Sequence, residues 1–147
     1  MARPNTLQGK YINLRLGDGA TPEVFNIVCG LIDKSFTNQV NTNDQFIPDC
    51  ADPESIPWRE VVETGRQKDI SGSGFLNRAN LADMHAALGQ KRNWRYEFDE
   101  PTGDTVYGGY WGGVGVMTNF EVTGTQDDLV SVTLTVVSHG AWTFTAA

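Results

Sequence analysis

Two histidines are the side chains best suited to acid–base or metal chemistry in this chain of 147 residues, and neither lies in a catalytic pattern. His85 falls on the apolar face of an expected helix, where a packing histidine is more common than a base or a metal ligand. His139 precedes Gly140 at the end of an expected strand, so a turn residue is the simpler interpretation. Neither histidine belongs to a Cys/His/carboxylate spacing that binds metals. A hydrolase needs both a nucleophile and a base, so we predict no enzyme, no metal and no cofactor.

Two glycine-rich stretches look like catalytic or nucleotide motifs but lack essential parts of them. Residues 71–74, Ser-Gly-Ser-Gly, have neither the Gly-Lys-Ser/Thr ending of a phosphate loop nor the strand–turn–helix placement of a hydrolase nucleophile. Residues 112–115 have no helix after them, so they fail as a dinucleotide fingerprint. At 71–74 we expect small residues because the strand crosses under another element.

Four aromatic residues allow two interpretations. Trp94, Tyr96, Tyr110 and Trp111 could form a platform for a sugar or a base. Alternating aromatics pack a core more often, and this is the interpretation that we favour. A monomeric carbohydrate-binding β-sandwich that uses these aromatics as its platform stays open as an alternative.

Alternation of apolar and polar residues predicts that most of the chain is β-structure. One stretch differs, because Leu81, Met84, His85 and Leu88 are spaced i, i+3, i+4 and i+7 and form one face of a helix. We therefore predict a mainly β fold, a β-sandwich or barrel of two packed antiparallel sheets with one flanking α-helix over residues 80–89. The alternating apolar positions are Trp94, Tyr96 and Phe98; Val114, Val116, Phe120 and Val122, with Met117 on the polar face; and Val130, Val132, Leu134 and Val136.

Glycine, proline and polar residues mark where these elements are expected to begin and end. Residues 24–40 form one bent strand or two, paired with a strand through Phe46 after a turn near Asn41. Asn80 is expected to cap the helix, and Gly89 to end it in a left-handed turn. The other expected strands are 10–16, with Ile12, Leu14 and Leu16 on one face; 66–76; 92–99 with 105–111 as a hairpin; and 114–123 with 129–138 as a second hairpin.

Residues 48–58 form an extended loop that is long for a compact domain. The loop holds three prolines and the acids Asp49, Asp52 and Glu54, so it is expected to be exposed. Trp58 is its one large aromatic side chain and must find a packing partner. Loops approaching this length tend to be functional, which makes this loop a candidate contact surface.

Length and charge limit the possible functions. The chain is long enough for one domain, which we place at residues 1–147 with a loose N-terminal arm at 1–8. Its 11 Lys and Arg against 18 Asp and Glu give a net charge of −7, which disfavours tight binding to a phosphate backbone. No apolar run approaches the roughly 20 residues of a membrane helix, and the N-terminus is too polar for a signal peptide. Cys29 and Cys50 have no metal-ligand spacing, so we expect free thiols.

The order of these elements carries a family resemblance. The loop ends in Trp-Arg-Glu-Val-Val-Glu-Thr-Gly-Arg at 58–66 and is followed by the strand at 70–76. In its element order the chain resembles the major tail tube proteins of long-tailed phages and gene transfer agents. Type VI secretion tube proteins are similar in fold and are the nearest competing identity. The other stretches that carry the resemblance are the helix at 81–88 with 94–98, the pair 116–124 and 127–138, and the ending Gly-Ala-Trp-Thr-Phe-Thr-Ala at 140–146.

The resemblance implies a structural virion protein without enzymatic activity. Such a protein forms six-fold rings that stack into a tube for linear double-stranded DNA, its non-specific cargo. Its partners are other copies of itself, the tape-measure and tail-terminator proteins, and the distal-tail or baseplate proteins. It is assembled in the host bacterial cytoplasm, ends in the tail of the virion and does not insert into a membrane.

By position, the resemblance also implies which residues meet the next ring and which line the channel. The inter-ring loop corresponds to 48–58, and the channel strands to 35–46 and 92–111. Six copies carry 6 × −7 = −42 charges, so repulsion from DNA phosphates over about 8 Å would let DNA slide. The inter-ring residues are Asp49, Asp52, Glu54 and Trp58, and the lumen-facing residues are Asn93, Arg95, Glu97 and Asp99.

Overall fold

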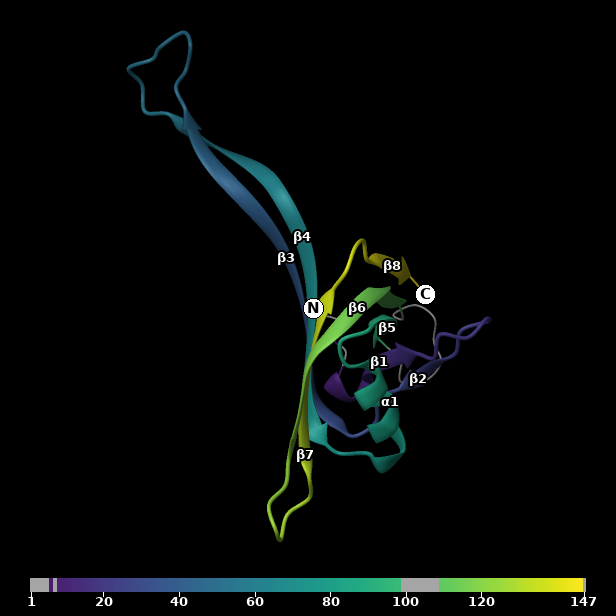
Figure 1. Cartoon of the computed structure of the whole chain (residues 1–147). Helices are drawn as coiled ribbons and strands as arrows, with labels where there is room; N and C mark the ends of the chain where they lie inside the picture. The colour runs from purple at the N-terminus through teal and green to yellow at the C-terminus, as the bar shows by residue number, and fades with distance from the viewer. Residues whose placement is uncertain (1–5, 7, 99–108, 147) are drawn as a thin grey trace, which may run out of the picture.

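The computed structural model describes residues 6, 8–98 and 109–146, most of which lie in β-strands (Figure 1). The prediction of a mainly β fold with a short flanking helix is confirmed. The elements are a 3-10 turn at Gly9–Tyr11, β1 (Ile12–Gly17), β2 (Phe25–Ile27), β3 (Leu31–Ile47), β4 (Trp58–Phe75), a 3-10 turn at Arg78–Asn80, α1 (Leu81–Ala87), β5 (Lys91–Phe98), β6 (Gly109–Thr123), β7 (Ser131–Ser138) and β8 (Thr143–Ala146).

The strands form one antiparallel sheet in the order β2-β1-β5-β6-β7-β4-β3, and β8 pairs with the start of β6. The sheet curves until β3 packs against β5, where the Phe36 ring stacks on the Tyr96 ring with centroids 5.1 Å apart. The Tyr96 hydroxyl also donates to the Lys34 backbone carbonyl at 3.1 Å. The two packed layers expected from the sequence are therefore two parts of one continuous sheet, with the core between them.

Side chains that alternate along the strands fill this core. Trp94 and Tyr96 of β5 are buried, so they pack the core and do not form an exposed platform. The inward residues of β1 and β7 are buried as the alternation predicts. The buried hydrophobic residues are Leu14, Leu16, Val28, Ile70, Met84, Ala87, Trp94, Tyr96, Met117, Val132, Leu134, Val136 and Trp142.

Strand β6 departs from the predicted pattern. The sequence predicts separate strands before and after residues 112–113, but these two glycines stay extended and pair with β5, so β6 is unbroken. Met117, expected on the polar face, is fully buried. The register of β6 against β7 shifts between Met117 and Asn119, and the inward position changes from Met117 to Phe120. A β-bulge of this kind reverses the alternation beyond it.

The helix begins differently from the prediction. Asn80 makes no capping hydrogen bond, so its predicted role is wrong; its Nδ2 instead donates to the Ile27 carbonyl at 3.2 Å. The side-chain cap lies at the preceding 3-10 turn, where Asn77 Oδ1 accepts from the Ala79 backbone N–H at 3.1 Å. The extra turn moves the cap three residues toward the N-terminus.

The end of the helix agrees with the prediction. Gly89 has a φ of +75°, the left-handed conformation that ends many helices. Met84 is buried, and the His85 ring packs edge-on against Phe120 with centroids 5.4 Å apart. His85 and Leu88 are nevertheless exposed, and the helix buries Met84 and Ala87, so the apolar face predicted through His85 and Leu88 is wrong at these two positions.

Glycines in β6 make room for an aromatic side chain from the C-terminal segment. A Cβ atom on Gly113 would lie 2.6 Å from the Trp142 ring, which leaves no space for a side chain. The Trp142 Nε1–H donates to the Val114 carbonyl at 2.8 Å and fixes the chain just before β8. The glycine run therefore serves packing.

Replacing Gly113 with alanine should destabilise the fold, because the added methyl group overlaps the Trp142 ring. We expect a loss of about 1–3 kcal/mol in the free energy of unfolding, as is typical of overpacked cores. Denaturant unfolding measures this loss. Gly124→Ala is the matched control, since a Cβ there meets only Val130 at 4.0 Å. Equal stability of the two variants would show that Trp142 repacks without cost.

Candidate assembly interface

Strands β3 and β4 pair along their whole length and continue beyond the body as a two-stranded arm (Figure 1). The predicted turn near Asn41 is wrong, because β3 runs through Asn41 to Ile47, which pairs with Trp58. In a ribbon with solvent on both faces, polar residues are compatible with either side of the strand. The polar stretch 41–45 therefore pairs with β4 and does not turn.

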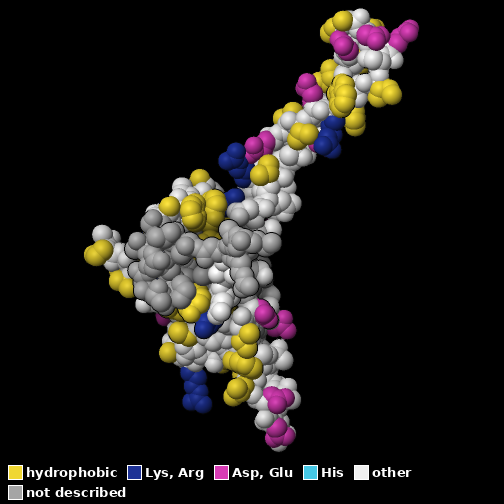
Figure 2. All heavy atoms as spheres, turned by 180° about the vertical axis from the view of Figure 1, so that it is seen from behind, with side chains coloured by type: hydrophobic (Ala, Val, Ile, Leu, Met, Phe, Trp, Pro, Cys, Tyr) yellow, Lys and Arg dark blue, Asp and Glu magenta, His cyan; other side chains and the backbone are white. Residues whose placement is uncertain are grey.

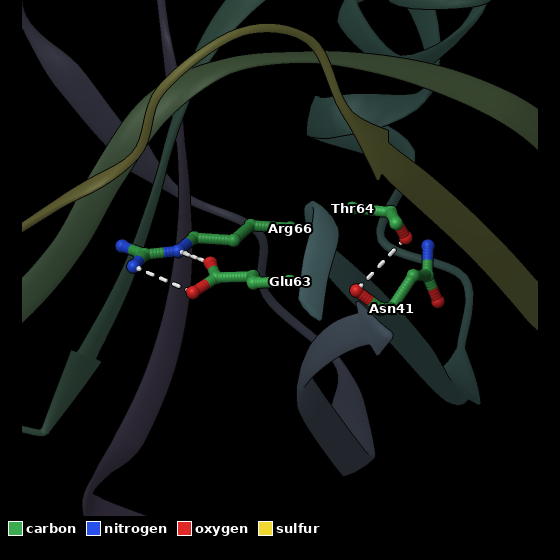
Figure 3. Close-up of polar contacts among 4 residues, drawn as sticks. All are labelled: Asn41, Glu63, Thr64 and Arg66. Carbon is green, nitrogen blue, oxygen red and sulfur yellow. Dashed lines mark hydrogen bonds and ion pairs between the residues drawn. The ribbon is translucent and has the colours of Figure 1, made fainter. Parts of the chain in front are cut away.

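A bulge lies part-way along the hairpin (Figure 3). The register shifts after Asn41, so Thr64 is the extra residue on β4. The Thr64 hydroxyl donates to the Asn41 carbonyl at 3.0 Å, and the Arg66 guanidinium binds the Glu63 carboxylate. The hydrogen bond from Arg66 lowers the pKa of Glu63, which favours the charged carboxylate. The Thr64 hydrogen bond joins the two strands where the alternation changes, whereas the Arg66–Glu63 pair lies within β4.

The arm carries exposed apolar side chains along its length (Figure 2). The register places Phe46 and Val61 on one face and Ile47, Val62 and Trp58 on the other. Trp58 is 88% exposed. A two-stranded ribbon has no further layer to cover such residues, and exposed apolar patches mark protein–protein contacts. The arm is therefore the candidate interface of this chain.

The tip of the arm brings together the residues that the sequence predicts as contacts. Asp49, Asp52 and Glu54 are exposed in the loop between the strands, and Trp58 follows as the first residue of β4. The Ser55 hydroxyl donates to the Asp52 carbonyl at 2.7 Å and shapes the loop. An apolar hollow beside acidic groups suits a partner with both apolar and basic side chains. The hollow is lined by Phe46, Ile56, Pro57, Trp58 and Arg59.

Two of the predicted lumen residues make polar contacts with neighbouring segments. Asn93 Nδ2 donates to the Glu23 carboxylate at 2.6 Å. The Glu97 carboxylate binds Arg15 Nε on β1, also at 2.6 Å. Asp99 lies outside the described residues. The role of these three residues at the lumen stays a prediction.

Arg95, the fourth predicted lumen residue, packs between two aromatic rings. Its guanidinium carbon lies 3.7 Å from the centroid of Phe25 and 4.4 Å from that of Tyr110. Cations are attracted to the faces of aromatic rings, and this contact ties β5 to β2 and β6. The Arg95 charge is thus engaged within the chain.

Sequence reasoning missed a second surface, the outward face of β3, β4, β7 and β6. Phe36 and Ile70 lie opposite each other in the core, so residues one position away point outward. We call this surface the polar sheet face. The residues named for it below include three acids and no lysine or arginine. Its residues are Asp33, Ser35, Thr37 and Gln39 on β3; Gln67, Asp69, Ser71 and Ser73 on β4, with the apolar Phe75 at the end of the strand; Ser131, Thr133, Thr135 and Val137 on β7; and Asn119, Glu121 and Thr123 on β6.

The basic residues of the same hairpin lie on the opposite face. Lys34, Arg66 and Lys68 share the face of Ile70, and Lys68 Nζ lies 4.8 Å from the centroid of the Trp111 ring. The alternation of Ser and Thr with apolar residues in β7 is a signal for a polar face. The separation of charge becomes visible only when the pairing of the strands is known.

Within the part of the chain that the structure describes, no helix has the length and apolar character needed to cross a membrane. No three His, Cys, Asp or Glu side chains among those residues gather into a possible metal site. Cys29 and Cys50 are free thiols, as the sequence predicts, and the structure shows that both are exposed.

Comparison with known proteins points to one family. The family model for phage tail tube proteins matches residues 6–144. Among proteins with curated functions, none matches the chain significantly.

Solved structures share the fold at low sequence identity. The tail of an empty gene transfer agent particle, refined with C6 symmetry, has a TM-score of 0.74 and 20% identity over 96% of this chain and 100% of that chain. The SPP1 tail tube has a TM-score of 0.68 and 9% identity over 97% of this chain and 80% of that chain. A sheath–tube complex of the extracellular contractile injection system PVC has a TM-score of 0.61 and 10% identity over 97% of this chain and 93% of that chain.

Truncation of two tryptophans to alanine should affect the stability of the fold to very different extents. Trp58→Ala should change the free energy of unfolding by no more than about 0.5 kcal/mol, because the side chain is 88% exposed. Trp94→Ala should cost about 3–5 kcal/mol, because Trp94 is completely buried. Denaturant unfolding of dilute protein measures both values. Similar losses for the two variants would place Trp58 in the core and remove it from the interface.

Proposed function

This chain belongs to the phage tail tube protein family, and on that premise we propose that its copies assemble into stacked hexameric rings, a tube that delivers double-stranded DNA to the host cell. The observation that carries this proposal is the arm, whose apolar side chains lie exposed on a ribbon far from the core. Such a ribbon is stabilised when neighbouring copies cover it. Stacked rings place copies within its reach.

Free strand edges support closure of a ring. The four-stranded part of the sheet, in the order β6-β7-β4-β3, ends in β3 on one side and in the second half of β6 on the other. Alternating antiparallel pairs give β3 and β6 opposite directions, so β3 of one copy can pair with β6 of the next and remain antiparallel. Six copies then make a closed barrel of 6 × 4 = 24 strands, which leaves no edge of this sheet unpaired.

The polar sheet face suits the lumen of such a tube. Its acids Asp33, Asp69 and Glu121 repel DNA phosphates. The other side chains named for this face are mostly uncharged hydroxyl and amide groups, so the face offers no lysine or arginine that could bind the phosphates. The segment 35–46, one of the two expected at the channel, lies on this sheet. We prefer it over the segment 92–111, because Arg95 is packed between aromatic rings.

The remaining roles follow from this assembly. Asp49, Asp52, Glu54 and Trp58 at the arm tip contact the adjacent ring. The ends of the tube meet the tail-terminator and the distal-tail or baseplate proteins, and the lumen holds the tape-measure protein before DNA. Assembly takes place in the host bacterial cytoplasm, and the product is the tail of the virion. The carbohydrate-binding alternative loses support because Trp94 and Tyr96 are buried.

Assembly should depend on concentration and on Trp58. The wild-type protein should be monomeric when dilute and form rings or tubes when concentrated or seeded, as sedimentation and negative-stain microscopy would show. Trp58→Ala should stay monomeric at concentrations where the wild type polymerises, because its main apolar anchor is lost. A wild-type protein that stays monomeric at millimolar concentration in the presence of seeds would contradict the proposed tube.

Lysines on the polar sheet face should slow DNA delivery. Virions built with Ser71→Lys and Thr133→Lys would carry 2 × 6 = 12 added positive charges per ring on this face. Phosphate contacts to these lysines should retard DNA, and added salt should weaken the effect. Thr143→Lys with Thr145→Lys is the matched control, because both residues are exposed on β8. Delivery at the normal rate by the first variant, or slowing by the control alone, would move the lumen to another face.

A further inference from the structure

Two apolar surfaces lie at opposite ends of the molecule. One is the arm tip, where Phe46, Ile56 and Trp58 are exposed beside the acidic loop. The other lies at the end of the body from which the β6–β7 hairpin projects, away from the arm (Figure 1). There Ile32 is 63% exposed and Leu129 is 73% exposed. Neither surface is covered by another described part of the chain.

Backbone contacts gather the second surface from three segments. The Phe75 N–H donates to the Gly30 carbonyl, and the Leu76 N–H to the Val130 carbonyl, both at 2.9 Å. These bonds bring the segments of Ile32, Phe75 and Leu129 together. Arg78 follows three residues after Phe75 and is exposed, and the ion pairs found among the described residues do not include it. We name the group of Ile32, Phe75, Leu129 and Arg78 the base patch.

Charge decides which part of this end accepts the arm tip. The loop of the β6–β7 hairpin carries Asp127 and Asp128, which repel the acids of the arm tip. Arg78 on the base patch attracts them. The base patch thus combines an apolar surface with a basic group, which complements a tip with apolar side chains and carboxylates.

We propose that the arm tip of one copy docks on the base patch of a copy in the adjacent ring. This inference rests on the proposed tube and names the surface that receives the arm. Because donor and acceptor are different surfaces at opposite ends, the contact is heterologous and cannot close in a pair of copies. It repeats along one axis, as a growing tube requires.

The two cysteines of the chain mark the two halves of this contact. Cys50 lies in the loop at the arm tip. Cys29 is adjacent to Gly30 and lines a shallow hollow together with Phe75 and Leu76. Both thiols are free and exposed. Docking therefore brings Cys50 of one copy near Cys29 of another, and this proximity is open to chemical cross-linking.

Cross-linking of assembled wild-type tubes with a flexible bismaleimide tests the docking. Each chain contributes two different thiols to two different contacts, so a denaturing gel should show a ladder of covalent multimers well beyond the dimer. Cys29→Ser and Cys50→Ser tubes should each lose the ladder. Tubes that give no multimers, or a dimer that persists in Cys29→Ser from pairing of two Cys50 residues, would overturn the base patch. Absence of tubes in every preparation would instead count against the proposed function.

Charge reversal gives an independent readout. Arg78→Glu should raise the protein concentration needed for assembly by roughly fivefold, since it places like charges in the contact. Combining it with Asp52→Arg should restore most of the loss. Lys91→Glu is the matched control, as it makes the same charge change at an exposed residue outside the base patch. Assembly of Arg78→Glu at the wild-type concentration, or no rescue by Asp52→Arg, would place the arm tip elsewhere.

Discussion

The pairing of β3 with β4 is the interaction on which the rest of the structure depends. In the body, it places Phe36 opposite Ile70 and completes the core against Tyr96. Beyond the body, the same ladder carries the tip outward, with no second layer to support it. A two-stranded ribbon gains little from its own side chains, so its order comes from continuity with the core and, in the proposed tube, from neighbouring copies. Fold and assembly therefore share one hairpin.

Strand alternation also separates the chemistry of the two faces of this hairpin. Lys34, Arg66 and Lys68 lie on the inner face, whereas Asp33 and Asp69 lie on the outer face. A net charge of −7 by itself says nothing about where repulsion acts. The register places acidic and hydroxyl groups together on the outer face. The basic groups lie on the inner face, where Lys68 packs on the Trp111 ring.

Much of the fold could be predicted from the sequence because burial forces alternation in β1, β5 and β7. Prediction failed where a local irregularity overrode the pattern. The bulge after Met117 reversed the faces of β6, and a 3-10 turn before α1 is capped by Asn77 in place of Asn80. The arm could not be recognised from the sequence. A ribbon that is exposed on both faces does not require apolar and polar residues to alternate, and the polar residues 41–45 resemble a turn. The acidic tip was predictable from its prolines and carboxylates. The polar sheet face was not, because a face exists only when strands distant in sequence are paired.

Charge and apolar surface act over different ranges, and in the proposed tube this difference makes assembly conditional. Acidic groups at both ends of the molecule, Asp49 and Asp52 in the arm-tip loop and Asp127 and Asp128 in the β6–β7 loop, repel approaching copies over about 8 Å in physiological salt. Apolar side chains such as Trp58 contribute only when water has been excluded from the contact. A single arm thus meets repulsion before it gains attraction. In the proposed ring, six arms engage together, and the summed contacts exceed a barrier that one copy meets alone. An existing ring end therefore favours addition of copies over their association free in solution.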